Sequence, residues 1–226
     1  MLKILLILLL SALVVVSGYM VYKEVSTQQK EIEKFDELQK IVEETTDVPE
    51  TNNEESNTEE LSDTIEKSRN LISLFERNAD CIGWICIPDT NINYPVMHTP
   101  NNPQKYLRKD FDGQYSQSGV PFLDARCNAE SGTAIIYGHN MKNGTQFSDL
   151  KNFLNTDFRN AHSVIEYETK TGVRYFIVET VKKTDIYDEI YNQIKNEDDT
   201  LILSTCYGSA KSGRLIIIAK EAKANG

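Results

Sequence analysis

Two apolar runs near the end of the chain decide the fold: TLILSTC at residues 200–206 and RLIIIA at residues 214–219. Both are rich in β-branched and aliphatic residues, and the loop between them contains two glycines, which predicts a pair of adjacent antiparallel strands. In such a pair Cys206 ends the first strand and Arg214 begins the second, so the two residues face each other. Because a neighbouring cation favours the nucleophilic thiolate over the thiol, this strand end is a candidate for cysteine chemistry.

Residues 1–23 predict a membrane signal-anchor. Residues 4–22 contain no charged side chain, and a run of that length can cross a somewhat thin bilayer. A cleaved signal peptide is the alternative, since the small residues Ser17 and Gly18 lie near a potential cleavage point. Lys3 and Lys23 flank the run symmetrically, so the positive-inside rule gives no orientation.

Residues 24–70 predict an acidic stalk. They carry 15 Asp and Glu against 5 Lys and Arg, a net charge of −10 that equals the formal charge of the whole chain. The acidity therefore belongs to the stalk and says little about a substrate. Residues 45–60 have almost no apolar side chains and predict a disordered tether. Before them, apolar residues at helical spacing predict a short amphipathic helix carrying Ile32, Phe35, Leu38 and Val42.

Residues 71–226 predict one mainly β domain, either a β-barrel or a β-sandwich, of a size that can bury a core. A helix is expected from about Ser62, with Ile65, Ile72 and Phe75 facing the body. Two helical interruptions are expected, at residues 147–154 and 185–195. Besides the final hairpin, strand-like runs bounded by Gly, Pro, Asn and Asp occur at residues 82–87, 92–96, 120–123, 133–137, 164–167 and 174–182.

The other cysteines fit packing better than chemistry. Cys81 and Cys86 flank a strand-like run, and an extended chain holds them too far apart for a disulfide. Together with Cys127 they are interpreted as small core or near-surface residues. Their spacing matches no familiar zinc pair and the three histidines are scattered, so no metal is expected.

His139 is the best candidate for a proton donor and acceptor. It lies in YGHN at residues 137–140, directly after an apolar strand, where a rigid scaffold often holds functional side chains. His98 and His162 have weaker settings and are assigned to loops or core edges. A Cys, a His and an Arg at strand ends would supply a nucleophile, an acid/base and an oxyanion stabiliser. The alternative is an inert thiol, a surface histidine and a surface cation.

These residues carry a resemblance to a known family. LSTC at residues 203–206 followed by Arg214, together with YGHN at residues 137–140, resembles the signature of sortases, the cysteine transpeptidases of Gram-positive cell surfaces. Similarity to the class B branch is carried by further stretches and by the predicted helical insertion at residues 185–195. These stretches are GWICIP at 83–88 leading to YPV at 94–96, Tyr106-Leu107 through Phe111, and residues 119–124.

The resemblance implies a closed sortase-type β-barrel over residues 71–226, with an N-terminal helix and a helical insertion before the Cys-bearing strand. Cys206 would form a thioester with the Thr of a C-terminal sorting motif, His139 would exchange protons, and Arg214 would bind the oxyanion. The class also implies that the substrate groove is lined by Leu107, Asn102, Ser204 and Thr205.

The resemblance also implies partners and a location. The substrates would be surface proteins with an Asn-Pro-x-Thr-type or related sorting motif, and the acceptor would be the amine of a cell-wall peptide or its lipid-linked precursor. No metal, organic cofactor or nucleic acid is expected. The protein is expected in the cell membrane as a single-pass chain, anchored by residues 4–22 with its catalytic domain on the extracellular face.

Two alternatives belong to other classes. A secreted cysteine peptidase or peptidoglycan amidase would use the same nucleophile with water as the acceptor, and Asn140 is the nearest candidate to orient its histidine. A non-catalytic binding module on a stalk would need none of this chemistry.

Overall fold

The computed structural model describes residues 2–43, 69–130, 132–195 and 199–222. It divides into two units, residues 1–37 and residues 38–226. The predicted tether at residues 45–60 and the predicted helix start at Ser62 lie outside the described residues.

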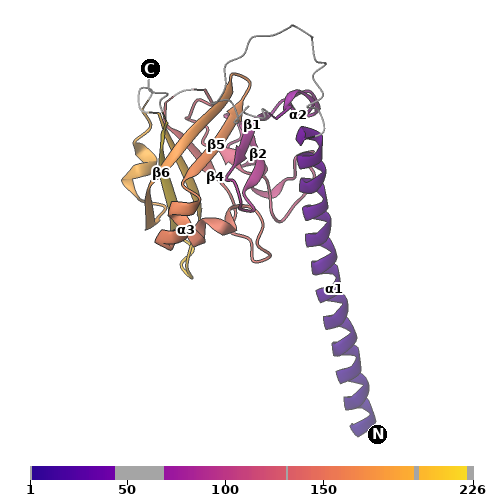
Figure 1. Cartoon of the computed structure of the whole chain (residues 1–226). Coiled ribbons are helices and arrows are strands. Elements are labelled where there is room, and N and C mark those ends of the chain that lie inside the picture. The colour runs from indigo at the N-terminus through magenta and orange to yellow at the C-terminus, as the bar shows by residue number, and fades with distance from the viewer. Residues whose placement is uncertain (1, 44–68, 131, 196–198, 223–226) are drawn as a thin grey trace, which may run out of the picture. The chain divides into compact units, whose positions relative to one another are not determined.

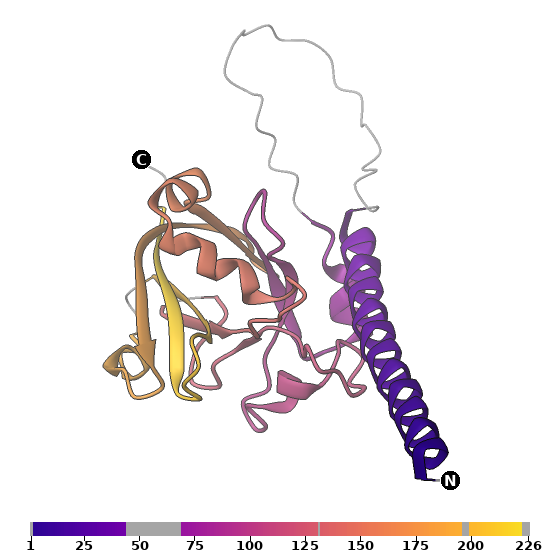
Figure 2. The same ribbon diagram turned by 90° about the horizontal axis from the view of Figure 1, so that it is seen from below.

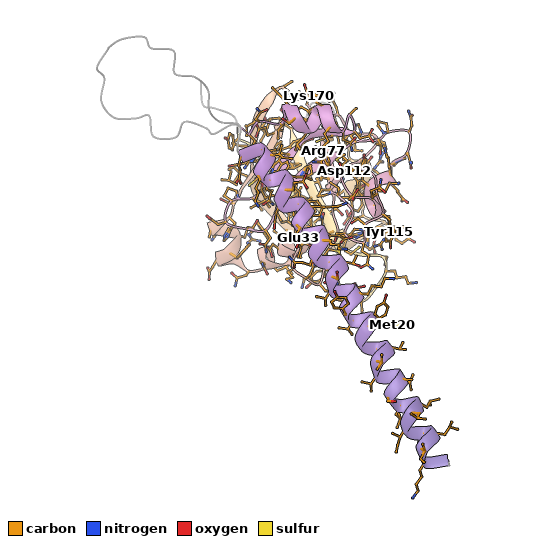
Figure 3. The ribbon with its side chains drawn as sticks, turned by 90° about the vertical axis from the view of Figure 1, so that its right-hand side faces the viewer. Met20, Glu33, Arg77, Asp112, Tyr115 and Lys170 are labelled. Carbon is orange, nitrogen blue, oxygen red and sulfur yellow. The ribbon has the colours of Figure 1, made fainter. Side chains whose placement is uncertain are left out.

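The first unit is part of one long helix, α1 (Leu2–Glu43). By length and composition this helix is long and apolar enough to cross a membrane, and it is the one such helix among the described residues. The apolar side chains of residues 4–22, Met20 among them, are exposed (Figure 3). The sequence predicted an anchor followed by a separate short helix, whereas the two are continuous. Gly18 is the one poor helix former within residues 4–22, and residues 24–43 are rich in Glu, Gln and Lys, which favour helix.

The second unit is built on a closed barrel of eight strands within the described residues (Figures 1 and 2). Around the barrel the strands follow the order β1-β2-β3-β4-β7-β8-β6-β5, and β5 pairs with β1 to close it. The pairs β2–β3 and β4–β7 are parallel and the other pairs are antiparallel. The strands are β1 (Cys81–Cys86), β2 (Asn93–Met97), β3 (Phe122–Leu123), β4 (Ala134–Tyr137), β5 (Val164–Thr169), β6 (Gly172–Asp185), β7 (Thr200–Cys206) and β8 (Gly213–Glu221).

Every predicted strand is present. The sequence predicted either a β-barrel or a β-sandwich, and the closed sheet shows that the fold is a barrel. The last turn of α1 belongs to this unit, where Leu38 and Val42 are buried as the helical spacing predicted. Gln39 fastens that turn to β2 by donating from Nε2 to the carbonyl oxygen of Asn93 at 2.9 Å.

The helices of the second unit are short. They are α2 (Ile72–Arg77), the 3₁₀ helices η1 (Lys105–Arg108), η2 (Phe147–Leu154) and η3 (Glu189–Asn192), and α3 (Thr156–Ala161). The helix expected at residues 147–154 is present with those bounds, as a 3₁₀ helix. It packs on β7 and β8 through the fully buried Phe147, Leu150 and Phe153.

The helical insertion at residues 185–195 is much shorter than predicted. Among the described residues it is reduced to the single 3₁₀ turn η3, which follows β6 after its pairing with β8 ends at Asp185. Ile186, the first of the isoleucines spaced by four, is 45% exposed, so this spacing does not mark a buried helix face.

The hairpin that decides the fold has the predicted bounds at β7, and Cys206 lies opposite Arg214 in the register. Each residue of β7 from Thr200 to Thr205 is buried, whereas Cys206 is exposed. The candidate nucleophile is therefore the first residue of the strand to leave the core.

We predict that the stability of the barrel depends on β8 more than on the outer surface of β6. Ile217→Ala removes a fully buried side chain and should lower the free energy of unfolding by about 2–5 kcal/mol. Ile177→Ala, at a strand position that is 41% exposed, should cost less than about 1 kcal/mol. Urea unfolding of both variants measures the difference, and equal losses would contradict the described burial.

Candidate active site

The register of β4 and β7 brings His139 to Cys206. In this parallel pair Tyr137 lies opposite Ser204, and the ladder continues with a 3.1 Å hydrogen bond from the Gly138 amide to the Ser204 carbonyl. His139 and Cys206 each follow two residues after this matched pair. Two residues 67 positions apart in the chain are thus placed at the same edge of the sheet.

Arg214 reaches that edge from the other side of β7. The hairpin between β7 and β8 is tight at Gly213, where a Cβ would lie 2.2 Å from the carbonyl oxygen of Tyr207. Directly after it, Arg214 donates from Nη1 to the carbonyl oxygens of Gly213 at 2.8 Å and Lys211 at 3.1 Å. These bonds hold the guanidinium at the loop beside Cys206.

The three residues line one cavity of about 610 Å³. Three of the predicted groove residues, Leu107, Ser204 and Thr205, line it as well. Asn102 is exposed and does not belong to the lining, whereas the next two residues, Pro103 and Gln104, do. The η1 region thus contributes to the cavity, but from positions just after the asparagine that the sequence indicated.

A backbone carbonyl orients His139. Its Nε2 lies 2.9 Å from the carbonyl oxygen of Leu107, so Nε2 carries the proton that is donated there. In the neutral ring Nδ1 is then the nitrogen that can accept a proton. Burial lowers the pKa of His139 below its usual 6.5, against the opposing influence of the Leu107 hydrogen bond, so the imidazole is neutral at pH 7. A carbonyl group exists at every residue, and the sequence therefore contained no signal for this contact.

Two side chains fasten the ends of β4 and β7 to each other. Asn140 donates from Nδ2 to the Cys206 carbonyl at 3.0 Å, and Thr205 donates from Oγ1 to the Gly138 carbonyl at 2.8 Å. Gly138 is required between them, since a Cβ there would lie 2.6 Å from the ring of Phe147. Asn140 thus holds the backbone of Cys206 rather than the imidazole of His139.

Another part of the cavity lining is an aromatic and ionic network that the sequence did not indicate. Tyr137 donates its hydroxyl to Asp124 Oδ2 at 2.9 Å, and its ring stacks on Tyr191 of η3 with centroids 6.2 Å apart. The hydroxyls of Tyr191 and Ser204 lie 2.8 Å apart. Arg126 completes the network through its ion pair with Asp124.

Comparison with known proteins agrees with this geometry. A family model for the sortase domain matches residues 85–222. Sortase B of Listeria monocytogenes is 31% identical over 180 residues, which cover 66% of this chain and 73% of that protein. The chain belongs to the sortase family. Sortase B of Staphylococcus aureus is 28% identical over 183 residues, covering 67% and 74% of the two chains.

A solved structure supports the same family. The crystal structure of sortase B from Bacillus anthracis is 26% identical to this chain with a TM-score of 0.66, and the match covers 88% of this chain and 100% of that one. The resemblance drawn from LSTC and YGHN is confirmed, and the chain is a class B sortase, a cysteine transpeptidase. The non-catalytic binding module that the sequence left open is thereby set aside.

The remaining cysteines of this sortase are free thiols outside the cavity lining. Cys81 and Cys127 are buried and Cys86 is half-buried, as the sequence predicted. Burial raises the pKa of Cys81 to about 12 and the pKa values of Cys86 and Cys127 to about 11, so all three remain protonated at neutral pH. Cys206 is the exposed cysteine of the four.

We predict that His139 of the sortase titrates below pH 6.5. As the pH falls through 6.5 the unfolded chain binds a proton that the folded chain does not, so the free energy of unfolding decreases toward the folded pKa and then levels off. NMR titration of the imidazole measures the pKa. His98 has a pKa lowered by burial too, so His139→Gln identifies the resonance and should reduce the pH dependence of unfolding. A midpoint at or above 6.5 would contradict the burial of the ring.

Proposed function

We propose that this class B sortase cleaves a C-terminal sorting motif after its Thr through a Cys206 thioester, and then transfers the acyl group to the amine of a cell-wall peptide. One observation carries the proposal: the exposed end of an otherwise buried strand, Cys206, shares one cavity with His139 and Arg214. A cavity open to a peptide, with a thiol, an imidazole and a guanidinium in its lining, holds the groups that acyl transfer needs.

In the first step the Cys206 thiol gives its proton to His139 and the sulfur attacks the Thr carbonyl carbon. The neutral imidazole favoured by burial is the form that can accept this proton, at Nδ1. Arg214 donates to the oxyanion that forms, and donors of this kind contribute about 3–4 kcal/mol in serine hydrolases. The imidazolium then protonates the leaving amine as the peptide bond breaks, which leaves the thioester.

In the second step the incoming amine attacks the thioester carbon and loses a proton to His139. The carbon–sulfur bond breaks, and the leaving thiolate of Cys206 recovers that proton. Because a thioester retains the energy of the acyl bond, the new amide forms without ATP.

We also propose the place and the partners of the reaction. Residues 4–22 of α1 would anchor the chain in the cell membrane as a single span, with the catalytic domain on the extracellular face; the length and apolar composition of this helix support the anchor. The substrates would be surface proteins with an Asn-Pro-x-Thr-type or related motif. Leu107, Ser204 and Thr205 line the cavity where the motif would bind.

We predict that Cys206→Ala abolishes acyl-enzyme formation. Mass spectrometry of the enzyme with an Asn-Pro-x-Thr peptide should show a covalent adduct on the wild-type protein that the variant lacks. With added amine the wild-type protein should yield the amide product. Cys86→Ala is the matched control, since this half-buried thiol is outside the cavity lining, and it should keep the adduct. Hydrolysis with no amide product would favour the peptidase alternative.

We predict that Arg214→Lys reduces turnover by about a hundredfold with the fold intact. Lys replaces the planar fork by a point charge, so it cannot both keep the loop carbonyl bonds and donate to an oxyanion. Steady-state cleavage measures the loss, circular dichroism checks the fold, and Arg159→Lys on α3 controls for the substitution itself. Wild-type turnover in the Arg214 variant would remove this residue from the mechanism.

A further inference from the structure

The shortened insertion contributes part of the cavity wall. Its two ends are bonded to other segments, Ile186 to the Ser212 carbonyl and Lys195 to Thr133, and between them η3 reaches the cavity through Tyr191.

Three groups contact Tyr191: the Ser204 hydroxyl meets its phenol, the Tyr137 ring stacks on its ring, and Arg126 donates from Nη2 to its backbone carbonyl at 2.9 Å. The carbonyl contact crosses 65 positions of the chain, from the loop after β3 to the insertion after β6.

The Asp124 carboxylate holds the Arg126 guanidinium in turn. Its Nε lies 2.9 Å from Asp124 Oδ1 and its Nη2 lies 2.8 Å from Asp124 Oδ2, a two-pronged ion pair. The Arg126 backbone amide also donates to Asp124 Oδ1 at 3.0 Å. Burial opposes ionisation of Asp124, but the hydrogen bonds from Arg126 and Tyr137 outweigh it and keep the pKa of this carboxyl below its usual value.

The contacts form a closed circuit. Arg126 binds Asp124, Asp124 binds Tyr137, Tyr137 stacks on Tyr191, and the carbonyl of Tyr191 returns to Arg126. All four residues line the cavity. In this circuit the Arg126 guanidinium is the group that binds the backbone of η3, because the other links to Tyr191 act through its side chain.

We propose that Arg126 is a positioning residue for peptide recognition, which holds Tyr191 in the wall of the groove. The inference rests on the proposed function only in taking the cavity as the binding site of the sorting peptide. Without the guanidinium, the backbone of η3 loses its bond to the loop after β3 and the Tyr191 ring is no longer held in one position, so the peptide binds to a more mobile wall. The cysteine chemistry at the end of β7 is unaffected.

The test compares Arg126→Ala with Arg77→Ala. Arg77 forms the same two-pronged pair with Asp112, both bonds at 2.8 Å, outside the cavity lining (Figure 3). Hydrogen–deuterium exchange should become faster in residues 189–193 of Arg126→Ala and stay unchanged there in Arg77→Ala. Unchanged exchange in both variants would overturn the proposal, whatever the enzyme does to peptides.

Steady-state kinetics separate an effect on peptide binding from an effect on the catalytic steps. With a quenched fluorescent Asn-Pro-x-Thr peptide, Arg126→Ala should raise KM about tenfold and keep kcat within about threefold, since a charged hydrogen bond of the wall is lost. The rate at which iodoacetamide alkylates Cys206 should not change. A fall in kcat at constant KM, or slower alkylation, would overturn the proposal.

A double-mutant cycle asks whether Arg126 acts through Tyr191. Tyr191→Ala should raise KM by itself, and adding Arg126→Ala should then change KM by less than about twofold. Independent, multiplying effects would overturn the proposal. If the wild-type protein cleaves no such peptide, the proposed function fails, while the exchange experiment still decides whether Arg126 holds the insertion.

Discussion

The parallel pairing of β4 with β7 is the constraint on which the rest of the site depends. Side chains alternate along a strand, so a shift of one residue would turn Cys206 and His139 to different faces. The register that matches Tyr137 with Ser204 is held past the ends of both strands by Asn140 and Thr205. It is also held by Gly138, which lets the chain pass the ring of Phe147.

Burial divides the cysteines of this chain into inert and accessible thiols. Removing a thiol from water disfavours the thiolate, which is why Cys81, Cys86 and Cys127 have raised pKa values. Cys206 is exposed to solvent because β7 leaves the core at that residue. The same strand therefore supplies the packing that stabilises the barrel and the exposed end where chemistry is possible.

The residues around Cys206 and the residues around Tyr191 are held in the cavity lining by different kinds of interaction. Around Cys206 the position of each group is set by sheet register and backbone hydrogen bonds, which are shared by many residues and hard to disturb. Around Tyr191 the wall is a single 3₁₀ turn that depends on side-chain contacts with Arg126, Ser204 and Tyr137.

The sequence by itself determined the strands and the three residues that the cavity brings together. Period and turn residues are local properties, so TLILSTC and RLIIIA specified a hairpin with Cys206 opposite Arg214. It overestimated the insertion: of the isoleucines spaced by four, Ile186 is 45% exposed and Ile190 and Ile194 are only half-buried. Only the tertiary structure shows that the Leu107 carbonyl is the partner of His139. Only the structure shows that Pro103 and Gln104, rather than Asn102, line the cavity, and that Arg126 binds the backbone of Tyr191. Those contacts join distant segments, often through backbone atoms that every residue has, so no pattern of residues in the sequence predicts them.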